Sequence, residues 1–344
     1  MYDVIIVGAG PVGLYTAGLL ESRLKVLVIE SKEKLGTKAC SGLYSTKLAG
    51  FVDIKKDFVE HKVKSALLHS PNGAVVKLEK KETTAFVVDR GLFEKYLAKR
   101  VKSKIMIKTR VTKIDVQKEN VIVYTNRGEF KAKMVIGCDG ANSVVRKNFG
   151  VQPKEIVNGL IAIVEKKDLS DFVDMWFDKE LISDGFFWKI PRGHTIEYGA
   201  LGNKITFRDL EKFFGLKNYE KKAAFIPIGP CKSYFERTLL IGDAAGITKP
   251  WSGGGLIFGF TCANIARDII FKAFDKNDFS EKFLKAYEKL WKEKIGKSIK
   301  FGLFARGIYK HMNNGQVNMA FGKMKYMKKL SGLDMDFPSL EEIS

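Results

Sequence analysis

Residues 1–30, MYDVIIVGAGPVGLYTAGLLESRLKVLVIE, predict a strand, a glycine turn, a helix and a second strand. Residues 2–7 and 26–29 are short apolar runs rich in β-branched side chains, which is typical of strands buried on both faces of a parallel sheet. The helical stretch between them completes a βαβ unit. The start of the chain therefore predicts an open α/β sheet.

Three glycines between these strands have the spacing G-x-G-x-x-G. Gly8 makes the tight turn, Gly10 lets a pyrophosphate approach the backbone, and Gly13 lets the helix pack closely on the strand. The helix that follows offers free N–H groups and the positive end of its dipole. Glu30, which ends the second strand, is placed to accept hydrogen bonds from an adenosine ribose. We expect a dinucleotide here, although this stretch alone does not say which one.

The charge of the chain is strongly positive. In 344 residues, 59 Lys and Arg against 39 Asp and Glu give a formal net charge of +20. Nucleic acid, an anionic membrane surface or an acidic substrate would each suit such a charge, and so would a lysine-rich surface with no particular partner. No helix-turn-helix, zinc-finger or aromatic RNA-binding pattern is present in the sequence, so we expect no nucleic-acid partner.

The four cysteines, Cys40, Cys138, Cys231 and Cys262, are scattered without a C-x-x-C pair. This spacing predicts neither a zinc nor an iron–sulfur site and suits a reducing compartment. No basic region precedes the first apolar strand, so no signal peptide is expected. We expect a cytoplasmic protein, with peripheral association at the inner face of the membrane as the alternative for a basic chain.

Polar segments follow several predicted strands. The loop 32–47 is too polar and glycine-rich for a core, and its Cys40, Ser41 and Gly42 could touch a cofactor because ligands bind at the carboxyl ends of strands in such sheets. Arg90 stands between a predicted strand and an amphipathic helix, where it could reach a phosphate. Asp139 follows another buried strand and presents polar groups at the same edge.

Hairpins and single strands are predicted in the first half of the chain. Residues 63–78 alternate around a Ser-Pro-Asn-Gly turn, and residues 120–135 turn at Asn-Arg-Gly, so both predict hairpins. Residues 105–114 predict one further strand. From about residue 150 the pattern changes to short β-like runs rich in aromatic side chains, which predict a second, largely antiparallel sheet.

The first pattern then returns. Residues 239–241 predict a strand, followed by Asp243, a glycine loop and a helix from about Leu256, whose N-terminus could hold an anion or a polar ring. We therefore expect an α/β fold in which a Rossmann-type domain is interrupted by an antiparallel-sheet substrate domain and followed by a helical C-terminal region. The expected boundaries are 1–60, 85–148 and 236–275 for the nucleotide domain, 61–84 and 149–235 for the sheet domain, and 276–344 for the basic helical region.

The C-terminal region is basic and amphipathic. Residues 281–330 carry 13 Lys or Arg against three Glu, and an apolar face is formed by Phe283, Leu284, Tyr287, Leu290, Trp291 and Ile295. Such a helix either lies on an anionic bilayer surface or packs on the protein with its lysines in solvent.

The motifs together resemble the flavoprotein superfamily that includes para-hydroxybenzoate hydroxylase. They are GAGPVG at 8–13 with Glu30, VDRGLFEKYLAKR at 88–100, GCDGANSVVR at 137–146 and GDAAGITKPWSGGG at 242–255. The resemblance implies that the dinucleotide is FAD. Within the superfamily the chain is most similar to the geranylgeranyl reductases, especially the archaeal digeranylgeranylglycerophospholipid reductases, through KACSGL at 38–43, the glycine segment after Asp243, and an approximate Y-x-W-x-F-P motif at 186–191.

This resemblance implies positions for the flavin and the substrate. The residues expected at FAD, from the resemblance and from the pattern above, are Gly8, Gly10, Gly13, Glu30, Cys40, Ser41, Gly42, Arg90, Val111, Asp139, Asp243, Gly254, Gly255 and Leu256. Phe186, Trp188 and Pro191 of the aromatic motif are the expected substrate residues. Departures from the family pattern are a cysteine loop one residue shorter and an aromatic motif that reads F-x-W-x-I-P.

The implied activity is saturation of isoprenoid double bonds in a prenylated lipid. An unactivated double bond needs a hydride from reduced flavin and a proton on the other carbon. The candidate proton donors are Cys40 and water. Electrons would come from ferredoxin, NAD(P)H or a deazaflavin, and the single dinucleotide fingerprint favours a protein donor. The alternative is an FAD-dependent monooxygenase or halogenase acting on a small aromatic substrate, because F-x-W-x-I-P is close to the halogenase motif W-x-W-x-I-P.

Overall fold

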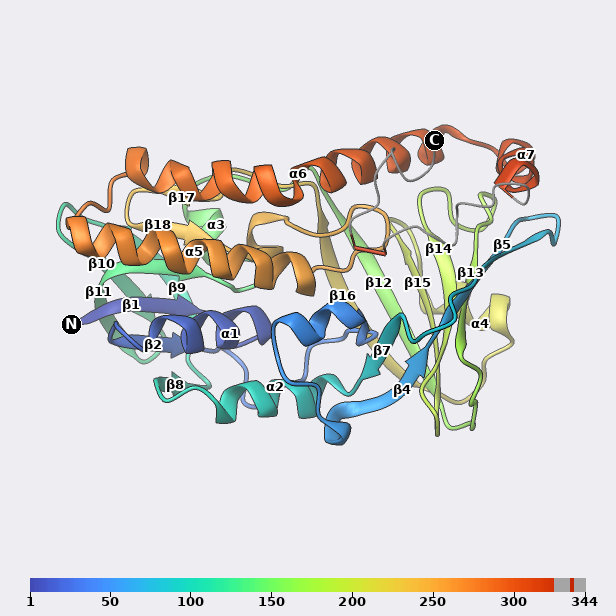
Figure 1. The fold of residues 1–344 in the computed structure, drawn as a ribbon, viewed down its shortest axis with the longest axis horizontal. Helices are drawn as coiled ribbons and strands as arrows, with labels where there is room; N and C mark the ends of the chain where they lie inside the picture. Colours follow the sequence, from blue (N-terminus) through green and yellow to red (C-terminus); the bar gives the residue numbers. More distant parts are fainter. Residues whose placement is uncertain (325–334, 337–344) are drawn as a thin grey trace.

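The computed structural model describes residues 1–324, 335 and 336. Two sheet-containing lobes lie along the long axis of the molecule, and one long helix runs over both of them (Figure 1). The predicted α/β fold with an interrupting second sheet is confirmed. Part of the expected basic C-terminal region, residues 325–334 and 337–344, lies outside the described residues.

The first lobe contains an eight-stranded sheet in the order β17-β18-β11-β1-β2-β8, with β10 also paired to β11 and β9 paired to β10. The neighbours from β18 to β8 are parallel, whereas β17, β10 and β9 pair antiparallel. The strands are β1 (Tyr2–Val7), β2 (Val26–Ile29), β8 (Lys104–Met106), β9 (Val111–Val116), β10 (Val121–Thr125), β11 (Gly128–Gly137), β17 (Tyr234–Phe235) and β18 (Thr238–Leu240).

The single strand predicted at 105–114 was wrong, because this stretch forms β8 and β9 at different places in the sheet. Lys108 between them has a positive φ of 53°, which interrupts the extended backbone. The turn is held by backbone hydrogen bonds from Lys108 to Lys32 and from Thr109 to Glu30. Both hairpins were predicted correctly.

The second lobe contains a seven-stranded sheet in the order β16-β12-β15-β14-β13-β5-β6. It is antiparallel except for the β13–β5 pair. Its strands are β5 (Ser65–His69), β6 (Val75–Leu78), β12 (Glu155–Val164), β13 (Phe172–Trp176), β14 (Phe186–Pro191), β15 (Ile196–Gly202) and β16 (Glu220–Ile228). A small sheet of β3 (Leu43–Ser45), β7 (Ala85–Val88) and β4 (Val59–Val63), which the sequence did not predict, lies between the lobes (Figure 1).

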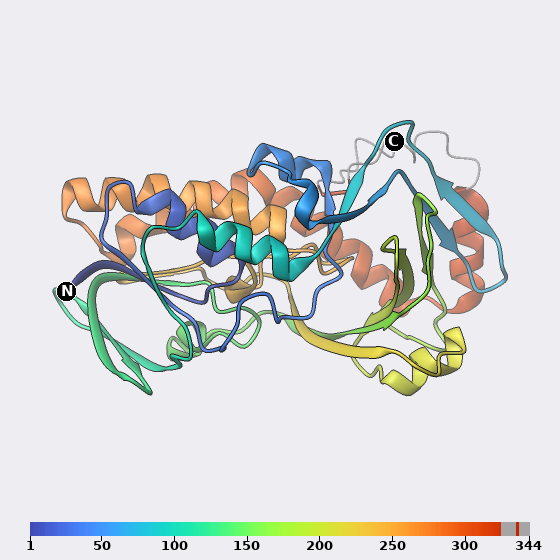
Figure 2. The same ribbon diagram turned by 90° about the horizontal axis from the view of Figure 1, so that it is seen from below.

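The helices cover the two sheets. They are α1 (Pro11–Leu20), α2 (Arg90–Lys99), α3 (Val144–Asn148), α4 (Phe207–Phe214), α5 (Leu256–Lys276), α6 (Glu281–His311) and α7 (Asn314–Met324), with 3₁₀ turns at Thr46–Gly50, Lys56–Phe58 and Gly242–Ala245. In the first lobe α1 packs against α2 and α5, and α5 packs against α6. In the second lobe the sheet lies between α4 and the C-terminal helices (Figure 2).

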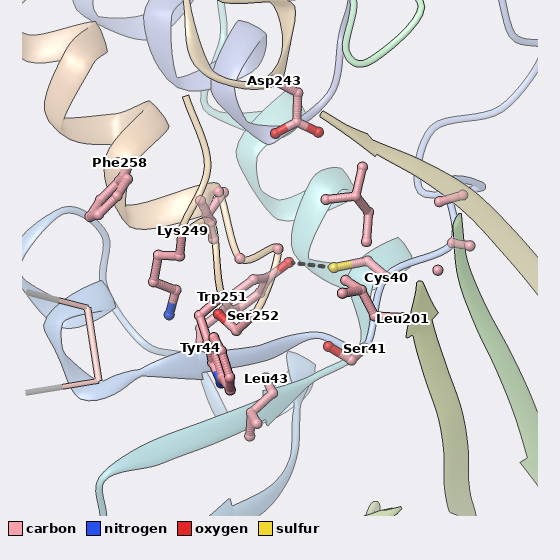
Figure 3. A pocket seen from close by; sticks show the side chains of 18 of the residues that line it. Cys40, Ser41, Leu43, Tyr44, Leu201, Asp243, Lys249, Trp251, Ser252 and Phe258 are labelled. Atoms are coloured by element: carbon pink, nitrogen blue, oxygen red, sulfur yellow. Dashed lines mark hydrogen bonds between the residues drawn. The ribbon is translucent and has the colours of Figure 1, made fainter. Parts of the chain in front are cut away.

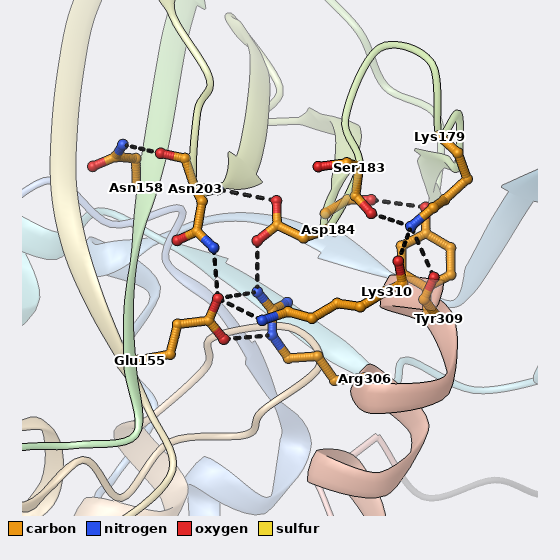
Figure 4. A network of polar contacts seen from close by, with 10 residues as sticks. Glu155, Asn158, Lys179, Ser183, Asp184, Asn203, Arg306, Tyr309 and Lys310 are labelled. Atoms are coloured by element: carbon orange, nitrogen blue, oxygen red, sulfur yellow. Dashed lines mark hydrogen bonds and ion pairs between the residues drawn. The ribbon is translucent and has the colours of Figure 1, made fainter. Parts of the chain in front are cut away.

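Helix α6 is bound to both lobes. Its N-terminal half docks on the first lobe, where the Tyr287 hydroxyl donates to the Leu240 carbonyl at 3.0 Å and the Trp291 indole donates to Ser233 at 2.9 Å. Its C-terminal half docks on the second lobe through Arg306, which pairs with Glu155 and Asp184 (Figure 4). Helix α6 is therefore a packed helix rather than one free to place its predicted apolar face in a membrane.

Most of that predicted face is buried, but not all of it. Leu284, Tyr287, Trp291 and Ile295 are buried, whereas Leu290 is 40% exposed. Among the described residues, no helix has both the length and the apolar character needed to cross a bilayer.

Candidate functional site

The carboxyl ends of the parallel strands meet at one edge of the first sheet and open into a large cavity. Gly8 follows β1, Glu30 follows β2, Asp139 follows β11 and Asp243 follows β18, and all four line the cavity. Its volume is about 1580 Å³. Pockets for one small ligand usually measure roughly 300–1,000 Å³, so this cavity has room for two ligands.

The glycine turn has the geometry that its spacing predicts. Gly8 has a φ of 103°, and a Cβ on Gly13 would lie 1.9 Å from the Gly8 carbonyl oxygen, so both positions require glycine. Gly10 is the N-cap of α1 without a side-chain cap. A Cβ on Gly10 would meet only an Arg90 nitrogen at 4.0 Å, which leaves an open space in front of the helix N-terminus.

Two carboxylates stand beside this turn. Glu30 accepts hydrogen bonds from the backbone of Ala9 and of Lys32, both at 2.8 Å, and so fixes the turn against β2. Asp139 accepts from the backbone of Val144 at 2.7 Å through Oδ2, while its buried Oδ1 has no hydrogen-bond partner among the described residues. Burial raises the pKa of Asp139 against the opposing effect of these hydrogen bonds. Asp139 therefore presents an unused polar atom at the cavity.

The cysteine loop lines the cavity, and Figure 3 shows Cys40 and Ser41 beside Tyr44 and Leu201. Cys40 Sγ lies 3.4 Å from the Gly42 amide and 3.4 Å from the Tyr44 hydroxyl. Arg90 donates to the same hydroxyl at 3.2 Å and is held by Glu94 at 2.5 Å. Gly42 has a φ of 66°, and a Cβ there would lie 2.1 Å from the Val88 carbonyl oxygen. The loop is thus pressed closely against β7.

The far part of the cavity is apolar and aromatic. One face of the second sheet contributes Met175, Phe177, Phe186, Trp188 and Leu201, and Trp251 comes from the glycine loop. The opposite wall is the C-terminal half of α6 and α7, with Phe301, Phe304, Ala305, Ile308, Val317 and Phe321. Phe304 and Ile308 line the cavity and are also 62% and 50% exposed, so they stand at its mouth.

The structure brings most predicted site residues to this one cavity. Those that line it are Gly8, Gly10, Glu30, Cys40, Ser41, Arg90, Val111, Asp139, Phe186, Trp188, Asp243, Gly254, Gly255 and Leu256. Gly13, Gly42 and Pro191 are not among the lining residues; the two glycines shape the backbone, and Pro191 is a buried residue at the end of β14.

Sequence reasoning missed several residues of the cavity. Lys38 pairs with Asp243 at 2.8 Å, Lys249 pairs with Asp336 at 3.0 Å, and Tyr44 holds Cys40. Lys38 and Tyr44 both lie within the loop 32–47 already singled out, so proximity to Cys40 could have suggested them. No local sequence pattern predicted that α6 and α7 form a wall of the cavity.

Comparison with known proteins agrees with this architecture. Residues 1–192 match the FAD binding domain family. A digeranylgeranylglycerophospholipid reductase of Methanococcus vannielii is 30% identical, covering 92% of this chain and 89% of that protein. The chain belongs to the digeranylgeranylglycerophospholipid reductase family.

Solved structures show the same fold. A geranylgeranyl bacteriochlorophyll reductase-like protein from Thermoplasma acidophilum superposes with a TM-score of 0.87 at 21% identity, covering 99% of this reductase-family chain and 94% of that one. A single-residue mutant of the halogenase PltM in complex with FAD gives a TM-score of 0.71 at 15% identity, covering 98% and 87%. At these identities the likenesses establish the fold alone.

FAD is the cofactor of this reductase-family chain, and the residues present fit it. The open space at Gly10 and the uncapped start of α1 suit a pyrophosphate, since helix N-termini bind anions. Asp139 Oδ1, which has no hydrogen-bond partner in the part of the chain that the structure describes, is a buried polar atom that a polar group of the cofactor would satisfy. A second helix start, at α5, follows Gly253, Gly254 and Gly255 and is also without a side-chain cap.

Proposed function

We propose that this chain is an FAD-dependent reductase that saturates the geranylgeranyl double bonds of archaeal-type membrane lipids or their precursors. The observation that carries the proposal is the continuity of the cavity. A polar cradle at the strand ends and an apolar compartment between the second sheet and α6 form one space of about 1580 Å³. An isoprenoid chain in the apolar part could therefore reach a flavin held in the polar part.

Reduced FAD, held in the polar part of the cavity, would supply the hydride for one carbon of the double bond. The chain must then supply apolar walls, exclude water and deliver a proton to the other carbon. We propose Cys40 as the proton donor. The Cys40 thiol gives up its proton as the second C–H bond forms, and the resulting thiolate regains a proton from solvent.

The surroundings of Cys40 suit this role. Arg90 donates to the Tyr44 oxygen, which leaves the Tyr44 hydroxyl hydrogen free to point at Cys40 Sγ. Burial raises the pKa of Tyr44, so the phenol stays protonated. The Gly42 amide is a second donor to the same sulfur. A thiolate formed at Cys40 would therefore accept two hydrogen bonds, each stronger to a charged acceptor than to a neutral one.

We also propose that the protein docks on anionic membranes along α6. Seven exposed lysines follow this helix: Lys282, Lys285, Lys289, Lys292, Lys294, Lys297 and Lys300. The stripe continues into Phe304 and Ile308 at the mouth of the cavity. Lysines near an anionic surface contribute about 1 kcal/mol each, and exposed apolar side chains can enter the interface.

Liposome flotation tests the docking. We expect strong binding to anionic vesicles, weak binding to neutral ones, and loss of binding in a Lys289→Glu/Lys297→Glu/Lys300→Glu variant. Lys81→Glu/Lys118→Glu/Lys131→Glu, which changes three exposed lysines elsewhere, is the matched control. Equal binding of the wild type to neutral and anionic vesicles would contradict the proposal.

The electron donor is proposed to be a protein such as ferredoxin, since the sequence carries one dinucleotide fingerprint. Stopped-flow measurements of the rate at which ferredoxin, NADPH and reduced deazaflavin reduce the bound flavin would rank the three electron donors.

The decisive experiment for the activity is anaerobic. The flavin-loaded protein is reduced chemically, mixed with a geranylgeranylated archaeal-type phospholipid, and the products are weighed by mass spectrometry. We expect a ladder of two-hydrogen increments with reoxidation of the flavin, and loss of the ladder in Cys40→Ala. Unchanged lipid would reject this substrate, and rapid oxygen uptake stimulated by a small aromatic compound would point to the monooxygenase or halogenase instead.

A further inference from the structure

A fully buried carboxylate lies behind the wall of the cavity and has no place in the chemistry described so far. Glu197 on β15 is 0% exposed. Its Oε1 accepts from the Trp188 indole at 2.8 Å, and its Oε2 accepts from Arg192 at 2.8 Å. Glu197 thus connects the aromatic strand β14 with the arginine that follows it.

Arg192 carries this connection to the cysteine loop. The same Nη1 that binds Glu197 donates to the Ser41 carbonyl at 2.7 Å, one residue from Cys40. Its Nη2 donates to the Val88 carbonyl of β7 at 3.3 Å and pairs with Glu60. One guanidinium therefore joins the cysteine loop, the small sheet and the aromatic wall.

Trp188 is fixed from the other side as well. It pairs with Gly199 across the strands, and a Cβ on Gly199 would lie 2.1 Å from the indole ring. The indole can lie flat against β15 only because Gly199 has no side chain, and the Glu197 carboxylate then sets its rotation. Trp188 lines the cavity, so the orientation of this wall depends on a residue outside the cavity.

A buried ion pair of this kind is a poor source of stability. Removing two charges from water costs several kcal/mol per ion, and apolar residues of similar volume often stabilise a protein as well or better. The directional contacts of Arg192 are what apolar residues could not reproduce, since a planar guanidinium can bind a carboxylate and a carbonyl at fixed angles.

We infer that Glu197, acting through Arg192 and Trp188, is a positioning residue that sets the distance between the cysteine loop and the aromatic wall. The isoprenoid chain lies along Trp188 and the proton comes from Cys40, so this distance decides whether a double bond faces the thiol. The inference rests on the proposed function for its catalytic consequence, but its structural consequence for Cys40 does not.

The test compares Glu197→Gln with Asp168→Asn. The glutamine variant keeps the shape of the side chain and the acceptor for the indole, but it removes the charge that orients Arg192. Asp168 is the control because it also forms an ion pair with a residue of β14, Lys189, at 2.6 Å. Neither Asp168 nor Lys189 lines the cavity. Two readouts are taken on the flavin-loaded proteins: the iodoacetamide alkylation rate of Cys40, followed by mass spectrometry, and the steady-state kcat and KM for lipid.

We expect alkylation of Cys40 in Glu197→Gln to be about tenfold faster, because the freed loop is more accessible, while Asp168→Asn stays within about twofold of the wild type. We expect kcat to fall about 10²-fold with KM nearly unchanged, as for a misplacement of about 1 Å. Arg192→Lys should behave in the same way, since an ammonium cannot hold both Glu197 and Ser41 in that geometry. This variant replaces Glu197→Gln in the test if Glu197→Gln does not fold.

Wild-type alkylation of Cys40 in folded Glu197→Gln or Arg192→Lys protein would overturn the inference. If the wild type leaves lipid unchanged, the proposed function fails, but the alkylation rates still decide whether Glu197 positions the cysteine loop.

Discussion

Replacing Arg306 with methionine tests whether α6 holds the far wall of the cavity in place. The side chain of Arg306 is 4% exposed and lies between two carboxylates of the second lobe (Figure 4). Its nitrogens are 3.2 Å from Glu155 and 3.1 Å from Asp184. Methionine fills most of the same space without charge, so the variant removes the ion pairs with little loss of packing.

The expected loss of stability depends on which hydrogen-bond partners Glu155 and Asp184 retain in the variant. Breaking a buried pair by removing one partner costs about 3–5 kcal/mol. Glu155 keeps Lys310 and Asn203, both at 2.7 Å, whereas Asp184 keeps only the Asn203 amide at 3.0 Å among the contacts of the described residues. We therefore expect Arg306→Met to lower the free energy of unfolding by about 3 kcal/mol. At a urea slope of about 3 kcal/mol/M, this loss lowers the unfolding midpoint by about 1 M.

The pH dependence gives a second measure of the same network. Burial alone would raise the pKa of Glu155, but hydrogen bonds from Arg306, Lys310 and Asn203 outweigh it and lower the pKa to about 2. A carboxylate whose pKa is lowered in the folded state stabilises the protein at pH values above its unfolded pKa, here about 4.5. This contribution to stability is lost as the pH falls to about 2. The wild type should lose stability over this window, and Arg306→Met should lose less.

The assay is urea unfolding followed by circular dichroism, at pH 7 and at steps down to pH 3. Arg23→Met is the control, because Arg23 and Asp275 form an ion pair with side chains 50% and 56% exposed, worth at most about 1 kcal/mol. If Arg306→Met shifts the midpoint no more than Arg23→Met, the buried network does not hold α6 and the reasoning fails.

Three further predictions concern the cavity. Gly10→Val should leave the fold stable but abolish flavin binding, measured by the flavin content of purified protein, because a side chain there meets little protein and projects into the space in front of α1. Tyr44→Phe should keep flavin and lower kcat for lipid about tenfold or more, since the thiolate that we propose at Cys40 would lose one of its two hydrogen-bond donors; an unchanged kcat would remove Tyr44 from the proposed mechanism. Phe186→Ala should lower the free energy of unfolding by about 3–5 kcal/mol in urea titrations and weaken lipid turnover more than flavin affinity, because Phe186 is 5% exposed and lines the apolar part.

The sequence predicts the nucleotide end of the site well because its signals are local. Gly8, Gly10 and Glu30 act within one βαβ unit, and the carboxyl ends of parallel strands necessarily meet at one edge. Asp139 and Asp243 follow from the same rule, since β11 and β18 join that sheet in parallel. No long-range information was needed to place these residues near one another.

Features that depend on special backbone geometry or on contacts between distant residues were harder to predict. Lys108 divides a stretch that looks like one strand, because lysine carries no visible signal for a positive φ. Leu290 fits the apolar period of its helix and yet is exposed, since periodicity does not say where the partner surface ends. The contact of Arg192 with Ser41 joins residues 151 positions apart, so the sequence around each residue gives no sign of it.

The same long-range contacts restrict how a lipid can enter. Helix α6 is fixed to the first lobe through Tyr287 and Trp291 and to the second lobe through Arg306. Between these contacts, a Cβ on Gly302 would lie 2.9 Å from Pro250 of the glycine loop. Parting the lobes would break these contacts together, at a cost of several kcal/mol from the buried pair alone. A lipid tail that enters past Phe304 and Ile308 displaces only side chains that are already half exposed. Entry along the lysine-bearing side of α6 is therefore the less costly route, and it leads the tail into the cavity that Trp188 and Cys40 line, with the lobes still joined.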